Sequence, residues 1–130
     1  MELSGTIQYN FDVSTASFVD SFSVASQEAN PTGIAFNTDG TKMYIAAYTS
    51  VIEYSLSTAF DITTASLSYT LGSMNGIYGV AFNSNGTKMY VSDDALNRVR
   101  QYNLSTAWNL STASSISVFS LSNEMANVRV

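Results

Sequence analysis

The chain contains no cysteine, no histidine and one proline, and charged residues make up only 12% of its 130 residues. Without Cys and His, a Cys/His zinc site, a Ser-His-Asp triad, a Cys-His pair and a disulfide framework are all excluded. The net charge is −5, and the only cations are Lys42, Lys88, Arg98, Arg100 and Arg129. We therefore expect no nucleic-acid partner and no membrane partner, because both require clustered basic charge.

The composition is otherwise that of a globular domain, with 45% apolar residues. Ser and Thr fill most polar positions, and these residues suit strands and turns better than helices. The first residues, MELSGTIQYN, lack the basic and apolar regions of a signal peptide. No apolar run reaches the roughly 18 residues that cross a bilayer.

Two sequence elements are repeated. GIAFNTDGTKMYIA (33–46) returns as GVAFNSNGTKMYVS (79–92), with nine of fourteen letters identical, and LSTAFDITTAS (56–66) returns as LSTAWNLSTAS (104–114). A shorter relative, FDVSTAS, lies at 11–17. The repeat distances are 46 residues for the first element and 48 for the second, which is typical of stacked supersecondary units.

Local patterns predict four short antiparallel strands in each unit. Asp39-Gly40 and Asn85-Gly86 lie between apolar runs and predict tight hairpins, because Gly adopts positive φ without strain. Further β-rich runs follow at 50–56 and 66–71, and no segment shows a helical period. Four strands in such a period predict an all-β fold of β-propeller blades. The first two strands of each unit are apolar on both faces, which favours a blade between two neighbours over a sandwich.

The segments NPTGIAFNTDGTKMYIA, EYSLSTAFDITTAS and QYNLSTAWNLSTAS also carry a resemblance. They resemble a tandem repeat of uncharacterised propeller-like proteins from phages, bacteria and marine metagenomes, and are more distantly similar to lactonase-like and NHL-type propellers. The resemblance covers residues 7–121 and implies a blade fold. It also implies a virion or extracellular location and an adhesive role. The chain departs from the repeat at its end, where GIAFN does not return after VFSLSNEMAN.

The predicted strands number ten, arranged as one partial propeller over residues 1–130. It comprises a half blade at 5–24 with strands at 5–11 and 17–24, blades at 33–71 and 79–121, and a short tail at 122–130. Closed propellers contain about four to eight blades, so one copy cannot close a ring. We expect closure by homo-oligomerisation, with a dimer favoured. A larger ring and a fragment of a longer chain are the alternatives.

Loops between and within the blades are the candidate ligand site, because propellers present such loops at one end. The expected ligand-binding residues are polar or aromatic loop residues: Asn30, Tyr48, Asn75, Tyr78, Asp93, Asp94 and Arg98. Exposed Tyr and Asn suit a sugar, because they offer an apolar face and hydrogen bonds. The alternative is that they are ordinary turn residues.

Two charged pairs and one aromatic residue also call for an interpretation. Asp93-Asp94 is the only adjacent carboxylate pair and suggests Ca²⁺ binding or glycosidase chemistry, or else a solvated loop. Arg98 and Arg100 share one face of a predicted strand, where they either clamp an anion or pair with nearby acids. Trp108 takes the place of Phe60 in the repeat, which indicates packing.

These patterns predict a non-catalytic binding or structural module that recognises a carbohydrate or a protein, and no cofactor, metal or catalytic residue. One alternative is a lactonase- or hydrolase-type propeller enzyme, as the more distant resemblance implies. Another is an engineered or evolutionary propeller fragment with no selected ligand.

Overall fold

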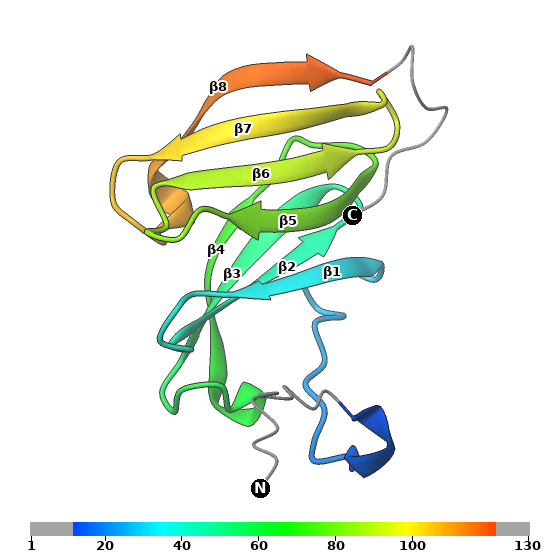
Figure 1. The fold of residues 1–130 in the computed structure, drawn as a ribbon, viewed down its shortest axis with the longest axis vertical. Coiled ribbons are helices and arrows are strands. Elements are labelled where there is room, and N and C mark those ends of the chain that lie inside the picture. Colours follow the sequence, from blue (N-terminus) through cyan, green and yellow to red (C-terminus); the bar gives the residue numbers. More distant parts are fainter. Residues whose placement is uncertain (1–11, 122–130) are drawn as a thin grey trace, which may run out of the picture.

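The computed structural model describes residues 12–121 and contains two four-stranded antiparallel sheets (Figure 1). In each sheet the strands lie side by side in sequence order. The first sheet comprises β1 (Pro31–Phe36), β2 (Lys42–Ala47), β3 (Ser50–Leu56) and β4 (Ala65–Leu71). The second comprises β5 (Ile77–Phe82), β6 (Lys88–Asp93), β7 (Arg98–Leu104) and β8 (Ala113–Ser120). The all-β class and the repeated four-stranded unit are thereby confirmed.

The N-terminal segment differs from the prediction. Residues 17–24 were expected to form a strand, but they carry none, and their expected neighbour at 5–11 lies outside the described residues, as does the tail at 122–130. A strand is defined by hydrogen bonds to a partner strand, and residues 17–24 have no partner strand in the described part of the chain. The third copy of the repeat is nevertheless visible in a short 3₁₀ turn, η1 (Val13–Thr15), which matches η2 (Ile62–Thr64) and η3 (Leu110–Thr112).

Each 3₁₀ turn begins at the same kind of cap. The side chains of Asp12, Asp61 and Asn109 accept a hydrogen bond from the backbone N–H two residues later. Such Asx caps compete well with regular structure because a short oxygen-bearing side chain reaches its own backbone. The repeated D/N-x-S/T motif therefore encodes the corner that leads into the last strand of each sheet.

The two repeated sequence elements meet at one point in each sheet. The ring of Phe60 covers Gly40, and the ring of Trp108 covers Gly86 in the same way. The N–H of Trp108 donates to the carbonyl of Gly86 at 2.9 Å, and Phe60 repeats this bond to Gly40. Both glycines have φ near +72°, and a Cβ at either would lie within about 2.3 Å of the ring. The Gly of the hairpin and the aromatic residue of the corner therefore have to occur together, and Trp108 is a packing residue as predicted.

The sheets meet through their first strands, and β5 lies next to β1 in Figure 1. A Cβ at Gly33 would lie 2.8 Å from the carbonyl oxygen of Tyr78, so the close approach of these strands requires glycine. Thr32 adds a hydrogen bond from its Oγ1 to the carbonyl of Ile77 at 3.1 Å. The last strands, β4 and β8, are exposed over most of their lengths.

Two apolar clusters form the core. One fills the space between the sheets, and the other lies on the far face of the first sheet, where Phe22 and Val24 pack against it. Tyr54 and Tyr102, which take equivalent places in β3 and β7, are both buried. The expectation that both faces of the first strands are buried is wrong for β1, because Ile34 is 57% exposed. Besides its sheet neighbour β2, β1 contacts β5, whereas Val80 of β5 lies between the sheets.

Candidate functional site

Four loops meet at one end of the sheets, and three of them are tied together by backbone hydrogen bonds. The N–H of Ile77 donates to the carbonyl of Tyr48, and the N–H of Met74 donates to that of Thr49, each at 3.1 Å. The N–H of Asp94 then donates to the carbonyl of Gly76 at 2.8 Å. These bonds join the β2–β3, β4–β5 and β6–β7 loops into one surface. We call the surface formed by residues 26–30, 47–50, 72–78 and 93–98 the loop end.

The structure places all seven predicted site residues at the loop end, with different exposures. Asn30, Tyr48 and Asn75 are exposed. Tyr78, Asp94 and Arg98 are half-buried, while Asp93 is buried completely. The side chains that a ligand meets first are therefore one tyrosine and two asparagines.

Asp93 is a structural residue. Its Oδ2 accepts hydrogen bonds from Nε of Arg98 and from Nη2 of Arg100, both at 2.8 Å, and its Oδ1 accepts one from the N–H of Leu96 at 3.0 Å. Burial opposes the charged form of Asp93, but the bonds from Arg98 and Arg100 outweigh it and hold the pKa of Asp93 below its ordinary value of 3.8. This geometry differs from the solvated loop expected for Asp93-Asp94. It also agrees with the interpretation that the two arginines pair with a nearby acid.

One acidic residue at the loop end was missed by sequence reasoning. Oε2 of Glu28 accepts a hydrogen bond from the Thr49 hydroxyl at 2.8 Å, so the loop before β1 is linked to the β2–β3 hairpin. Glu28 is the only acid in the SQEANPT segment, and this charge was the available signal. The contact extends the loop end to the N-terminal side of the first sheet.

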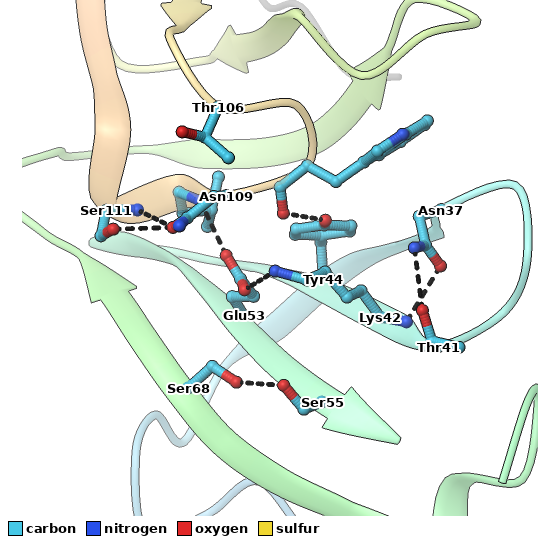
Figure 2. A network of polar contacts seen from close by, with 12 residues as sticks. Asn37, Thr41, Lys42, Tyr44, Glu53, Ser55, Ser68, Thr106, Asn109 and Ser111 are labelled. Atoms are coloured by element: carbon cyan, nitrogen blue, oxygen red, sulfur yellow. Dashed lines mark hydrogen bonds and ion pairs between the residues drawn. The ribbon is translucent and has the colours of Figure 1, made fainter. Parts of the chain in front are cut away.

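A second polar network lies between the sheets, away from the loops (Figure 2). Glu53 is 2% exposed, and its Oε1 pairs with Nζ of Lys42 at 2.5 Å while its Oε2 accepts from the N–H of Leu110 at 2.7 Å. The Tyr44 hydroxyl donates to the carbonyl of Trp108 at 2.6 Å. Burial, and then the nearby Glu53 carboxylate, raise the pKa of Tyr44, so this hydroxyl remains a donor. Every polar group here has a partner inside the protein, which is typical of a structural network.

Among residues 12–121, no three Asp, Glu, His or Cys side chains gather as a set of metal ligands. No helix in the same range is long and apolar enough to cross a membrane. An open pocket is present at the corner of the first sheet, and none of the predicted ligand-binding residues lines it. Its lining residues are Ser17, Val19, Asp20, Phe60, Asp61, Ile62 and Thr63.

The comparisons with known proteins bear on the fold. No family model matches the chain, and no curated protein matches it. A solved structure of a functionally unknown protein from Desulfotomaculum acetoxidans DSM 771 is similar over 73% of this chain, with a TM-score of 0.56 and 21% sequence identity. The match spans 28% of that longer chain. The likeness supports the all-β architecture of repeated four-stranded sheets, in agreement with propeller blades. It gives no information about activity, because the function of the similar protein is unknown.

Proposed function

We propose that the two sheets are consecutive blades of a β-propeller and that the loop end is a non-catalytic surface that recognises carbohydrate. The blade assignment is supported by the sheets' face-to-face stacking through their first strands and by their exposed last strands. The longer similar chain adds support. If two sheets occupy 28% of its length, it has room for about seven, within the usual four to eight blades.

The observation that carries the recognition proposal is the chemistry of the exposed loop residues. Tyr48 is 39% exposed on a hairpin whose carbonyls at 48 and 49 are both held by the neighbouring loop. Asn30 and Asn75 lie exposed in the flanking loops. An aromatic face beside amide groups on a pre-organised backbone suits a sugar ring, which presents both C–H and O–H groups.

The enzyme alternative, a lactonase or hydrolase, has less support in this geometry. The two most deeply buried carboxylates are Asp93, which accepts from two arginines, and Glu53, which accepts from Lys42 and the N–H of Leu110. A general acid or base needs a carboxylate within reach of substrate, and neither group faces solvent.

A glycan array on the full chain, with Tyr48→Ala and Tyr69→Ala as paired variants, tests the proposal. Tyr69 lies on β4 with 38% exposure, nearly that of Tyr48, so it controls for loss of an exposed aromatic ring. We expect binding to one glycan class that is lost in Tyr48→Ala and kept in Tyr69→Ala. Equal loss in both variants, or no binding to any glycan, would refute the carbohydrate proposal. A stoichiometric metal ion with hydrolytic activity would overturn the non-catalytic one.

A further inference from the structure

The two sheets contribute different surfaces to the contact between them. The first sheet contributes one face, whose residues in contact are Ala35, Tyr44, Ala46, Val51 and Leu71. We call the surface formed by these five residues the tyrosine face. The second sheet contributes its corner, in which Phe82 and Trp108 lie 4.4 and 6.4 Å from the ring of Tyr44. Two polar bonds fix the register: Tyr44 donates to the Trp108 carbonyl, and the N–H of Leu110 donates to Glu53 (Figure 2).

The second sheet repeats the tyrosine face on its other side. By the register of the repeat, the equivalent positions are Ala81, Tyr90, Ser92, Val99 and Phe119, with Gln101 in place of Glu53. Phe119 is 64% exposed, whereas its counterpart Leu71 is partly buried against the second sheet. Tyr90, Val99 and Gln101 are half-buried, and no third sheet exists within residues 12–121 to cover them.

Ser92 is a polar residue of this second tyrosine face. It stands where the buried interface has Ala46, and it is 1% exposed. Its Oγ has no hydrogen-bond partner in the described structure. A buried hydroxyl without a partner is unfavourable by about 1–3 kcal/mol.

The first sheet carries an unused copy of the receiving corner. Phe60 and Ile62 take the places of Trp108 and Leu110, and both line the open pocket described above. The pocket measures about 600 Å³, ample for a tyrosine side chain. Ser17, Val19 and Asp20 complete the lining of the pocket, so this corner borders the N-terminal segment and not another sheet.

The charges of the two unused surfaces match each other. Within the chain, the buried Glu53 and its Lys42 face a corner that begins with an amide, Asn109. On the unused surfaces the acid and the amide are exchanged, because Gln101 replaces the glutamate and Asp61 replaces the asparagine. Each combination contains one carboxylate and one amide, so two carboxylates never meet across the joint.

We propose that a second copy of this chain docks head-to-tail, with the Tyr90 face of one copy on the Phe60 corner of the next. The hydroxyl of Tyr90 then donates to the Phe60 carbonyl, and the N–H of Ile62 donates to Gln101. Strand β8 of the incoming copy takes the place held by residues 17–24, which releases Phe22 from its contact with Tyr54, now 5.4 Å between ring centroids. A heterologous contact of this kind continues until a ring closes. The inference rests on the blade assignment of the proposed function and does not depend on carbohydrate binding.

Complementation between two variants of the full chain tests whether the Tyr90 face of one copy binds the Phe60 corner of another. Tyr90→Ala removes the face and Phe60→Ala removes the corner, so we expect sedimentation velocity to show each variant alone as a monomer. An equal mixture retains one intact joint and should form a 1:1 dimer. Tyr48→Ala, at the loop end, should assemble as the wild type does. A monomeric wild type through the micromolar range, or a mixture that stays monomeric, would overturn the inference.

Charge exchange provides a second test that leaves the core untouched. Gln101→Glu should weaken self-association tenfold or more, because it places a carboxylate against Asp61 across the joint. Adding Asp61→Asn should restore association, since the pair then repeats the chemistry of Glu53 and Asn109. Unchanged association in Gln101→Glu, or no recovery in the double variant, contradicts the proposal. Assembly without glycan binding refutes only the carbohydrate proposal, and glycan binding by a lasting monomer refutes only the docking.

Discussion

Replacing Gly86 with alanine should destabilise the protein by about 2–4 kcal/mol. Gly86 has φ +72°, where an L-residue is disfavoured by roughly 1–2 kcal/mol. The new Cβ would also lie 2.3 Å from Cδ2 of Trp108, so the ring has to leave its position. Forcing extra volume into a packed site typically costs about 1–3 kcal/mol.

Urea unfolding followed by tryptophan fluorescence measures this effect directly, because Trp108 is the single tryptophan and its ring lies on Gly86. Gly72→Ala is the matched control. No atom lies within 4 Å of a Cβ built at Gly72, so this variant should match the wild type or gain up to about 1 kcal/mol through the unfolded state.

A double-mutant cycle separates the ring contact from backbone strain. In Gly86→Ala/Trp108→Ala the Cβ has no ring to displace, so the two changes should be less than additive by about 1–3 kcal/mol. Circular dichroism replaces fluorescence for the variants without tryptophan. A loss below about 0.5 kcal/mol in Gly86→Ala, or strict additivity in the cycle, would refute the proposed coupling of hairpin and corner.

Three further predictions concern the polar groups of the core. Glu53→Ala should cost about 2–4 kcal/mol in urea unfolding, because it leaves Lys42 and a backbone N–H without their buried partner, and a change under about 1 kcal/mol would contradict this role. The lowered pKa of Asp93 stabilises the fold at pH values above the ordinary 3.8, and this contribution is lost as pH falls through the lower folded value. Asp93→Asn should therefore flatten acid unfolding curves in that range, and an unchanged curve would disprove the linkage. Tyr44→Phe should cost about 1 kcal/mol in the monomer, and Tyr90→Phe should cost clearly less, while equal costs would argue against the asymmetry of the two faces.

Features set by neighbouring residues could be read from the sequence. The hairpins at Asp39-Gly40 and Asn85-Gly86 follow from local turn chemistry, and the order of the eight described strands follows from the repeat. The pairing of Arg98 and Arg100 with an acid was among the alternatives, because residues two apart on a strand share a face. Trp108 was recognised as a packing residue because Phe60 occupies the same place.

Features set by contacts distant in sequence could not be read in this way. Asp93 looked like half of an exposed pair, yet two arginines five and seven residues later enclose it. The burial of Glu53 depends on the corner of the other sheet, 57 residues away. Residues 17–24 match the repeat in sequence, but a strand depends on a partner as well as on its own residues.

The exchange of Glu53 for Gln101 shows how a repeat can be altered without losing its geometry. An identical second copy would have placed glutamate at 101, and that carboxylate would face the Asp61 corner in any head-to-tail joint. Nothing inside the described chain requires glutamine there, because Gln101 lies on the face that no other sheet covers. The substitution acquires a physical reason only when the uncovered face is considered together with the Phe60 corner, on which no sheet lies in the described chain. For this reason the charge-exchange pair of variants tests the docking more sharply than the loss of any apolar contact.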